Sequence, residues 1–516
     1  MEEIINAGVW SVVPPILAII LALVTKEVIS SLCVGIFSGT LIYAFVFKGG
    51  MMNAINETFL MMGRKIGDNA SIILFISFLG ALVAIITMAG GSRAYGKWAS
   101  QKIKTKKGVQ LGTCLLGILI FIDDYFNCLT IGTVMRPVAD NKKISRAKLA
   151  YIIDATAAPI CIIAPISSWA ASVISQMDSL QFQGEKINGM ALFMKSIPYN
   201  LYAILTLIMV VIVCVTNIEF GPMKKFEEEA RKPGYDPEAN NGSGMSDEFS
   251  DMVISEKGKV YDLLIPVITL IGFALFMMLY VGGYFEGGLT LAQAFGNTDA
   301  GEALAVAGFG ALVVAFILFV PRKLLSFNRF MDGITTGIKS MVGAFVILTL
   351  AWTISSVCRE MLGTGEYVGM LVSKSNFPPV LIPTLMFVIS GGLAFAMGTS
   401  WGTFGILIPI VAMICDAVAP ELLVISLAAT LAGAVFGDHC SPISDTTILS
   451  STGAGCKHID HVSSQIPYTL VVAACCIVGY LIAGFTKNMW FTLGVSIAML
   501  LILLFGLNIY FHHHKS

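Results

Sequence analysis

The chain has 516 residues, of which 56% are hydrophobic and 13% charged, and its formal net charge at pH 7 is -1. Soluble domains carry about a quarter charged residues, so this composition excludes an ordinary soluble protein. A net charge near zero gives no sign of a nucleic-acid partner. The apolar residues lie in long runs, such as 70–90 and 263–281, and runs of about 20 residues cross a bilayer core.

The first apolar run, at 9–24, follows the acidic start Met1-Glu2-Glu3. A secretory signal begins with a positive segment and ends at a cleavage site, so this run is predicted to remain as a membrane span. The 11 cysteines are scattered and form no CxxC pair. We therefore expect small buried thiols rather than a disulfide framework or a metal site. No nucleophile–base set is visible, so we expect neither an enzyme nor a cofactor.

Basic residues cluster at 93–107 and again at 142–148, and such clusters mark the cytoplasmic side of a membrane. Only one apolar segment, at 109–138, separates the two clusters, and Asp123 and Asp124 interrupt it. The simplest topology is a re-entrant hairpin that enters from the cytoplasm and returns, with the acidic pair at its tip. Non-helical backbone at that depth is tolerated only where it lines a cavity.

The charged segment at 219–259 contains Gly and Pro without apolar periodicity, which predicts a flexible cytoplasmic linker. The two sides of this linker, 1–218 and 260–488, resemble each other at three places in the same order: 77–100 with 349–373, 121–126 with 395–400, and 165–168 with 442–445. Internal repeats of this kind are typical of transporters. A second hairpin is predicted at 378–417, broken at 398–403, and the last span, at 489–511, has no partner in the first half.

We therefore predict an all-α membrane protein made of two inverted-topology repeats and one extra C-terminal helix. Each repeat has about five transmembrane helices plus a re-entrant hairpin and a broken helix. An odd number of spans inverts the second repeat relative to the first. The distribution of Lys and Arg places the protein in a cell membrane with its N-terminus outside and its linker and C-terminus in the cytoplasm.

Acids within the membrane are functional candidates, because each costs about 2.5–3.5 kcal/mol at the bilayer centre. Asp154 precedes two prolines, Pro159 and Pro165, which should break the helix and expose carbonyl groups. The counterpart at 437–447 is polar or helix-breaking at nearly every position. Carboxylates, hydroxyls and carbonyls together suit a hard cation such as Na⁺. The predicted ion-binding residues are Asp123, Asp124, Asp154, Asp438, Ser441, Ser444, Asp445 and Thr446, with Na⁺ at Asp154, Asp438 and Asp445.

Other polar residues of the hairpins and breaks are candidates for binding a substrate: Asn127, Ser167, Ser168, Thr399, Ser400, Thr403 and His439. Serines and threonines in membrane helices as often bond their own backbone. The first acidic pair could serve only topology, and His439 could either carry a proton or pack the helix. Arg136 could pair with an anion, although the positive-inside rule also explains it.

The segment GDHCSPISDTTILSS at 437–451 resembles the NhaC-type sodium/proton antiporter family. The segment FIDDYFNCLTIGTVMRPVAD, with the Asp154 and Pro-Ile-Ser-Ser stretch after it, supports the resemblance, which runs through both repeats. It implies a fold with two re-entrant hairpins and two broken helices. It also implies transport of Na⁺ and H⁺, or coupling of these ions to organic acids or amino acids.

The sequence thus favours a secondary active Na⁺/H⁺ antiporter that works by alternating access. Na⁺ binding requires an ionised carboxylate, so Na⁺ and H⁺ would compete for it. The alternative is a Na⁺- or H⁺-coupled transporter or exchanger of a small organic acid or amino acid, with Thr399, Ser400 and Asn127 contacting the solute. A channel is not excluded by the sequence, although inverted hairpins favour alternating access. Analogy with related transporters suggests a homodimer.

Overall fold

The computed structural model describes the chain except residues 1–6, 26, 49, 122–123, 166, 179, 217, 236–253, 340, 365–366, 368–369, 371–377 and 514–516. Within the described part, ten helices are long and apolar enough to cross a membrane. One two-residue hairpin, β1 (Gln181–Phe182) with β2 (Glu185–Lys186), is antiparallel. The predicted all-α membrane class is confirmed.

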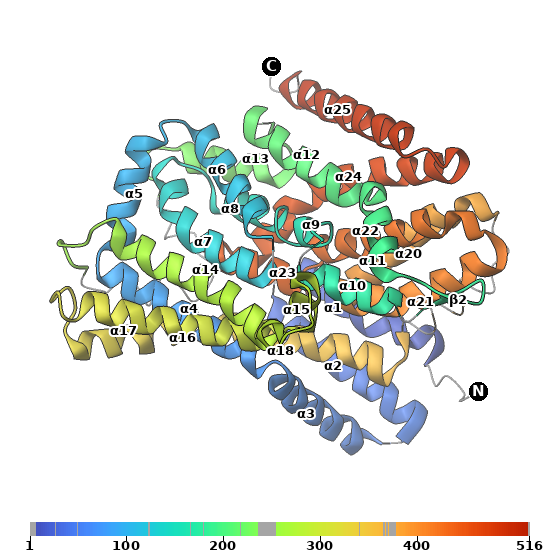
Figure 1. Ribbon diagram of the computed structural model, residues 1–516, viewed down its shortest axis with the longest axis horizontal. Helices are drawn as coiled ribbons and strands as arrows, with labels where there is room; N and C mark the ends of the chain where they lie inside the picture. Colours follow the sequence, from blue (N-terminus) through green and yellow to red (C-terminus); the bar gives the residue numbers. More distant parts are fainter. Residues whose placement is uncertain are drawn as a thin grey trace.

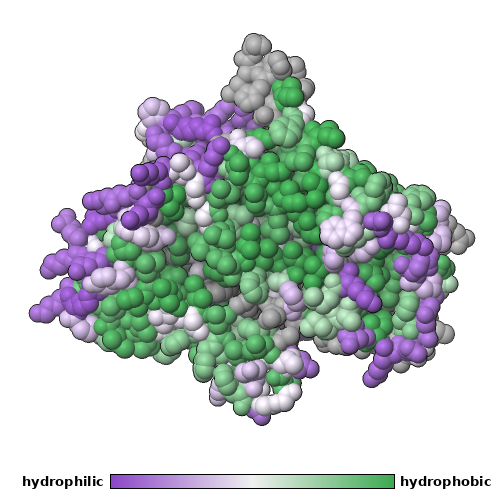
Figure 2. All heavy atoms as spheres, turned by 45° about the horizontal axis from the view of Figure 1, so that its top comes forward, coloured by the Kyte–Doolittle hydropathy of each residue, from purple (hydrophilic) through white to green (hydrophobic). Residues whose placement is uncertain are grey.

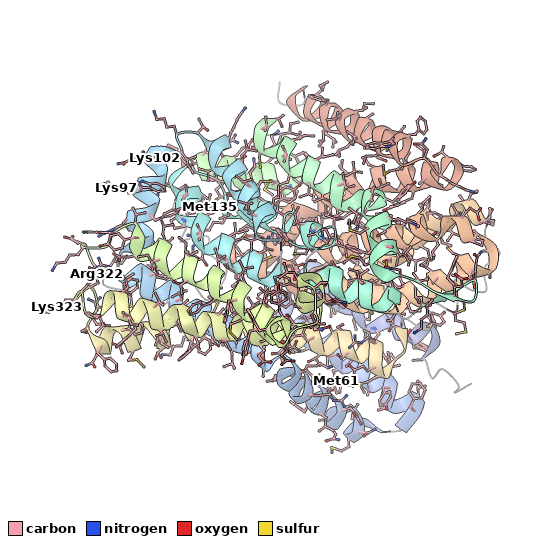
Figure 3. The ribbon with its side chains drawn as sticks, in the orientation of Figure 1. Met61, Lys97, Lys102, Met135, Arg322 and Lys323 are labelled. Atoms are coloured by element: carbon pink, nitrogen blue, oxygen red, sulfur yellow. The ribbon has the colours of Figure 1, made fainter. Side chains whose placement is uncertain are left out.

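The surface is divided in the way a membrane requires. Hydrophobic atoms cover the middle of the molecule and hydrophilic atoms gather at its left and right ends (Figure 2). Lys97 and Lys102 of α5 (Gly91–Lys102) lie at the same end as Arg322 and Lys323, which follow α16 (Ala300–Phe319) (Figure 3). Two basic segments more than 200 residues apart therefore share one end, which we call the basic end, as the charge rule predicts.

Helices from both halves pack together at the left and lower part of the molecule (Figure 1). In this region α4 packs against α16 and α17, α14 packs against α16, and α18 packs against α2 and α3. Their bounds are α1 (Val13–Thr25), α2 (Val28–Tyr43), α3 (Met51–Asp68), α4 (Ala70–Met88), α14 (Tyr261–Val281), α17 (Phe327–Lys339) and α18 (Val342–Ser356). A Cβ built on Gly337 would lie 2.3 Å from the carbonyl oxygen of Gly80. This crossing of α4 and α17 therefore requires glycine, because the two backbones touch.

The first hairpin consists of α6 (Lys106–Leu119) and α7 (Asp124–Asn141). At 1.5 Å per residue, α6 is about 21 Å long, too short to cross the hydrocarbon core. Lys106, at the start of α6, donates a hydrogen bond of 3.1 Å to the carbonyl oxygen of Lys143, just after α7. The two ends of the hairpin are thus neighbours, and the predicted interruption near Asp124 is confirmed.

The second hairpin consists of α20 (Ile382–Met397) and α21 (Ser400–Val418). Its turn is made by Gly398, whose φ of 66° is left-handed and favours glycine. The end of α24 (His458–Thr486) lies beside both ends of this hairpin. A Cβ on Gly484 would be 1.9 Å from the Val380 carbonyl oxygen, and Lys487 pairs with Glu421 at 3.1 Å.

Each hairpin is followed in sequence by a broken helix, as predicted. The first comprises α8 (Arg146–Asp154), α9 (Ala158–Cys161) and α10 (Ser168–Asp178), and it breaks directly after Asp154. The second comprises α22 (Leu423–Cys440) and α23 (Asp445–Ala454), and residues 441–444 separate them. Proline lies in both breaks because it lacks the N–H that would continue the helix.

The segment predicted as a flexible linker begins with a docked helix, α13 (Gly221–Arg231). Glu227 of α13 is fully buried; it pairs with Lys106 and accepts a hydrogen bond of 2.7 Å from the Ser145 N–H. Lys148, also fully buried, pairs with Glu219 at 3.0 Å. The start of the segment is therefore not the flexible linker predicted there, because these buried ion pairs hold it against α6 and α8. Residues 236–253 lie outside the described part.

The remaining helices are α11 (Gly189–Ser196), α12 (Leu201–Thr216), α15 (Leu291–Asn297) and α25 (Met489–His513). Short 3₁₀ or π turns lie at Gly8–Val12, Ala44–Lys48, Ile197–Tyr199, Tyr284–Glu286, Val357–Met361, Pro379–Leu381 and Pro420–Leu422. The inverted relation of the two halves, the domain boundaries and the sidedness of the termini stay predictions.

Replacing Gly337 by valine tests the crossing of α4 and α17. The new side chain would overlap the Gly80 carbonyl group, so we expect a loss of about 1–3 kcal/mol in stability, the usual cost of overpacking. Thermal unfolding in detergent measures the change. Gly272→Val is the matched control, since Gly272 is an exposed helical glycine with nothing within 4 Å of an added Cβ. Equal unfolding temperatures for the two variants would contradict the close crossing.

Candidate functional site

The second broken helix holds two buried aspartates, one on each side of its break. Asp438, in the last turn of α22, accepts hydrogen bonds from the Ser400 N–H at 3.1 Å and the Ser400 hydroxyl at 2.7 Å. Ser400 is the first residue of α21, so the second hairpin tip binds this carboxylate through a helix N-terminus. Oδ1 of Asp438 has no hydrogen-bond partner within the described residues.

Asp445, the first residue of α23, binds the other hairpin. Its Oδ2 accepts a hydrogen bond from the hydroxyl of Tyr125, which lies in the first turn of α7. Asp124, the residue before Tyr125, is also buried and only 2% exposed. The two carboxylates of one break are therefore each bound to a different hairpin tip.

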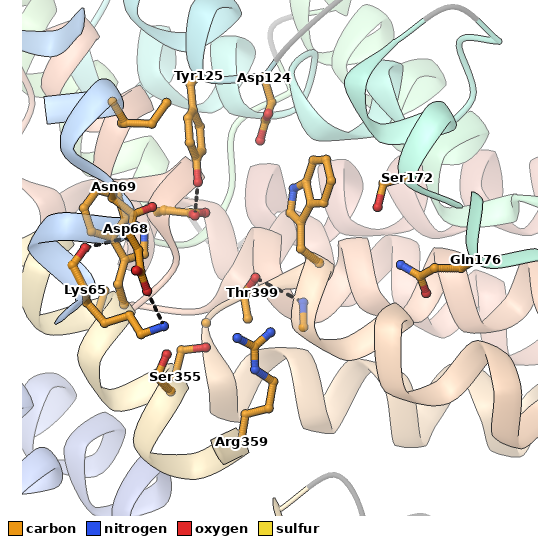
Figure 4. Close-up of a pocket in the computed structure, with 18 of the residues that line it drawn as sticks. Lys65, Asp68, Asn69, Asp124, Tyr125, Ser172, Gln176, Ser355, Arg359 and Thr399 are labelled. Carbon is orange, nitrogen blue, oxygen red and sulfur yellow. Dashed lines mark hydrogen bonds and ion pairs between the residues drawn. The ribbon is translucent and has the colours of Figure 1, made fainter. Parts of the chain in front are cut away.

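A cavity of about 690 Å³ reaches this arrangement. Figure 4 shows Asp124 and Tyr125 reaching into it from one side and Arg359 and Ser355 from the other, with Thr399 between them. Its lining residues are Lys65, Asp68, Asn69, Ile72, Asp124, Tyr125, Ser172, Gln176, Thr298, Ala351, Trp352, Ser355, Ser356, Arg359, Gly398, Thr399, Trp401, Gly402 and Asp445. Most of these side chains are polar, so the cavity is suited to water and a charged or polar cargo.

One wall of the cavity is cationic. Lys65 pairs with Asp68 at 2.9 Å and with Glu360 at 3.0 Å. Arg359 contacts Glu360 at 3.4 Å and keeps 45% of its side chain exposed. Arg359 lies on the π-helical turn η5 (Val357–Met361), and such turns are frequent at functional sites.

Asp154 belongs to a second buried group, which we call the histidine cluster: Asp154, His439, Ser450, His461 and Gln465. Oδ2 of Asp154 accepts a hydrogen bond of 2.7 Å from Gln465 and lies 3.1 Å from His461 Nε2 and 3.8 Å from His439 Nε2. Ser450 Oγ lies 3.0 Å from His461 Nε2. All five residues are at most 1% exposed, and none of them lines the cavity.

The structure separates the predicted ion-binding residues into groups. Asp124 and Asp445 line the cavity, Asp438 lies across the break from Asp445, and Asp154 lies with the histidines. Within the break, Ser444 and Thr446 lie 3.0 Å apart, and Ser441 donates a hydrogen bond to the Phe395 carbonyl oxygen at 2.8 Å. Asp123 lies outside the described residues.

Several predicted substrate contacts have structural partners instead. Asn127 donates to the carbonyl oxygens of Gly117 and Ile120 at 2.8 Å and of Thr156 at 3.2 Å, which fixes the first hairpin tip to the first break. Ser167 and Thr403 bond nearby backbone carbonyls at 2.7 Å and 2.9 Å, the alternative considered for them. Thr399 lines the cavity and caps α21, Ser400 binds Asp438, and the side chain of Ser168 is not described.

Sequence reasoning missed Tyr125, Lys65, Arg359, His461 and Gln465. One signal was available: His458, His461 and Gln465 recur at helical spacing just before a long apolar run, which places them on one face of a helix. Lys65 and Arg359 gave no such signal, because they come from helices whose contact depends on the tertiary fold. Within the described residues, no group of three or more His, Cys, Asp or Glu is arranged to hold a metal ion.

Three relatives give the context for this geometry. An uncharacterized protein of Haemophilus influenzae is 38% identical over 512 residues, 98% of this chain and 96% of its own length. The arginine/ornithine antiporter ArcD of Halobacterium salinarum is 30% identical over 31% of this chain and 32% of its own. The malate-2H⁺/Na⁺-lactate antiporter of Bacillus subtilis is 28% identical over 41% of this chain and 44% of its own.

The sequence profile of the Na⁺/H⁺ antiporter family matches residues 160–485. This span includes the second hairpin, Asp438 and Asp445 of the second break, and His439, His461 and Gln465 of the histidine cluster. The profile match extends over more than half of the chain and agrees with the resemblance seen in the sequence. The chain therefore belongs to the Na⁺/H⁺ antiporter family.

Proposed function

We propose that this protein, a secondary transporter by its family, exchanges Na⁺ for H⁺ by alternating access in a cell membrane. The observation that carries the proposal is the pair Asp438 and Asp445, which flank one helix break and are each bound to a different hairpin tip. Carboxylate, hydroxyl and carbonyl oxygens at a break are the ligands that a hard cation prefers.

The hydrogen bonds of the pair supply a physical basis for coupling. A cation that binds Asp445 competes with the Tyr125 hydroxyl for that carboxylate, and a cation that binds Asp438 competes with the Ser400 donors. Occupancy of the break therefore alters the contacts that hold both hairpin tips. A ligand shifts a conformational equilibrium only through such differences in contact between states.

The lining of the cavity supports access from one side. The lining includes Thr298, in the loop between α15 and α16. It includes none of the labelled residues of the basic end, which are Lys97, Lys102, Arg322 and Lys323. We infer that the cavity opens away from the basic end, toward the exterior if that end is cytoplasmic. For the site to open toward the basic end, the hairpin tips would have to move relative to the second break.

A second candidate is exchange of a small organic acid or amino acid coupled to Na⁺ or H⁺. The cavity of about 690 Å³ is of the size that holds organic ligands. Arg359 presents a half-exposed guanidinium to it, and guanidinium groups bind carboxylates in a bidentate manner. The names of two partial relatives, an arginine/ornithine antiporter and a malate/lactate antiporter, agree with such a cargo.

Asp438→Asn and Asp445→Asn test the first proposal. An amide carries no charge and is a weaker ligand for Na⁺, so we expect each variant to lose Na⁺-driven proton flux by about tenfold or more. Purified protein in liposomes with a trapped pH dye, given a Na⁺ gradient without organic solute, provides the measurement. Asp416→Asn is the matched control, since Asp416 accepts a hydrogen bond from the Gln183 N–H at the surface. Unchanged flux in both site variants would exclude this pair as the exchange site.

Arg359→Gln separates the two candidates. If the cargo is a carboxylate, losing the charged donor should raise its KM by about tenfold, since a charge-assisted hydrogen bond contributes about 1.5–3 kcal/mol. Uptake of labelled amino acids and dicarboxylates into the same liposomes measures the effect. Arg64→Gln is the control, because Arg64 also pairs with Glu360, at 3.2 Å, but does not line the cavity. Absence of any solute-dependent flux would leave Na⁺/H⁺ exchange as the activity.

A further inference from the structure

We propose that Asp154, His439 and His461 form a proton-binding site of their own, separate from the aspartates at the cavity. The proposal rests on the proposed Na⁺/H⁺ exchange and deepens it, since it assigns the proton and Na⁺ to different carboxylates. Asp154 comes from the first broken helix, His439 from the second, and His461 from α24. The site thus joins three elements that the hairpins also contact.

Unpartnered polar atoms surround the Asp154 carboxylate. Oδ1 of Asp154, Nε2 of His439, Nδ1 of His461 and Oε1 of Gln465 are all buried and lack a hydrogen-bond partner within the described residues. Leaving such an atom unpaired costs about 1–3 kcal/mol, so one on the carboxylate and three on the residues that contact it would be costly for a purely structural cluster. The unpaired atoms of the carboxylate and the two imidazoles are groups that can accept a proton.

The donor set favours H⁺ over Na⁺ at this position. Two of the three titratable groups are imidazoles, and hard cations such as Na⁺ prefer oxygen ligands. Nδ1 of His439 lies 2.8 Å from the Tyr202 hydroxyl of α12, which leaves Nε2 directed toward Asp154 at 3.8 Å. A proton shared among one carboxylate and two imidazoles needs no further ligand.

The titratable groups around Asp154 can be named element by element. α22 brings His439 with Cys440 beside it, α24 brings His458 and His461, α12 brings Tyr202, and α23 brings the Ser450 hydroxyl. On α8 itself, Tyr151 packs against Tyr468 with the two rings tilted and their centroids 4.9 Å apart. The basic residues of α8 are paired elsewhere, Lys148 with Glu219 at 3.0 Å and Arg146 with Asp140 at 3.1 Å. The histidines are therefore the groups placed to neutralise Asp154.

Gln465 and His458 link the cluster to the Na⁺-binding break. Gln465 Nε2 donates both to Asp154 and to the carbonyl oxygen of His439, the residue after Asp438. His458 Nε2 lies 2.7 Å from the Pro442 carbonyl oxygen, within the break. A proton on Asp154 weakens the acceptor that orients Gln465, so the change reaches the end of α22. One proton enters from water on one side and leaves to water on the other, with no covalent step.

The ratio of proton flux to Na⁺ flux tests the assignment. In liposomes with a trapped pH dye and radioactive Na⁺, Asp154→Asn and His461→Gln should lower this ratio by about tenfold. Asp445→Asn should lower both fluxes together and leave the ratio unchanged. Asp460→Asn is the matched control, because Asp460 is next to His461 in sequence but lines a separate surface pocket of about 200 Å³. If Asp154→Asn lowers both fluxes in step, the separate proton site is wrong.

Infrared difference spectroscopy of the protein in detergent, with pH as the only variable, tests the proton site without transport. Asp154→Asn should remove a carboxyl signal that added Na⁺ does not alter, whereas the signal removed by Asp445→Asn should respond to Na⁺. This result would support the proton site even if wild-type liposomes show no Na⁺-driven flux and the proposed function fails. A signal of Asp154 that Na⁺ displaces, or no titrating signal at all, overturns the assignment.

Discussion

Inside a membrane every backbone N–H and C=O group must find a partner within the protein, and the rest of this structure depends on that constraint. Two hairpins and two breaks leave such groups unpaired at their turns, and they satisfy one another. Asn127 bonds carbonyl groups of the first tip and the first break, and Ser441 bonds Phe395 of the second tip. The irregular backbone of the tips and breaks is thereby paired within the protein, and a polar cavity lies beside it.

The same constraint explains how much could be predicted from the sequence. Charge clusters located the first hairpin and prolines the first break, while polar or small residues within apolar segments located the second hairpin and the second break, because all of these are local properties of the chain. The candidate site was predicted only in part. Asp438 and Asp445 could be predicted because they lie next to a helix break that is visible in the sequence. Their hydrogen-bond partners could not, because Ser400 and Tyr125 come from two different hairpins. The docking of α13 was missed, since nothing local to Glu219 and Glu227 shows that Lys148 and Lys106 pair with them in the fold.

Two polar centres of different character result. The cavity centre is accessible, combines acidic and basic side chains, and lies between the hairpin tips. The histidine cluster is dry, carries one carboxylate and is enclosed by α8, α22 and α24. Buried hydrogen-bond networks are strong when satisfied and costly when incomplete. A transporter that leaves one network incomplete near another can therefore respond to a change as small as one proton.

The π-helical turn Val357–Met361 has a further consequence for the cationic wall. A π turn holds one residue more than the α-helical turn it replaces, and removing a residue from a helix rotates everything beyond it by about 100°. Arg359 now lines the cavity, while Glu360 accepts contacts from Lys65 and Arg64. A one-codon deletion here would restore an α-helical turn and change how Arg359 and Glu360 are placed relative to the cavity. Selectivity at this wall is thus open to change by length variation, without any substitution.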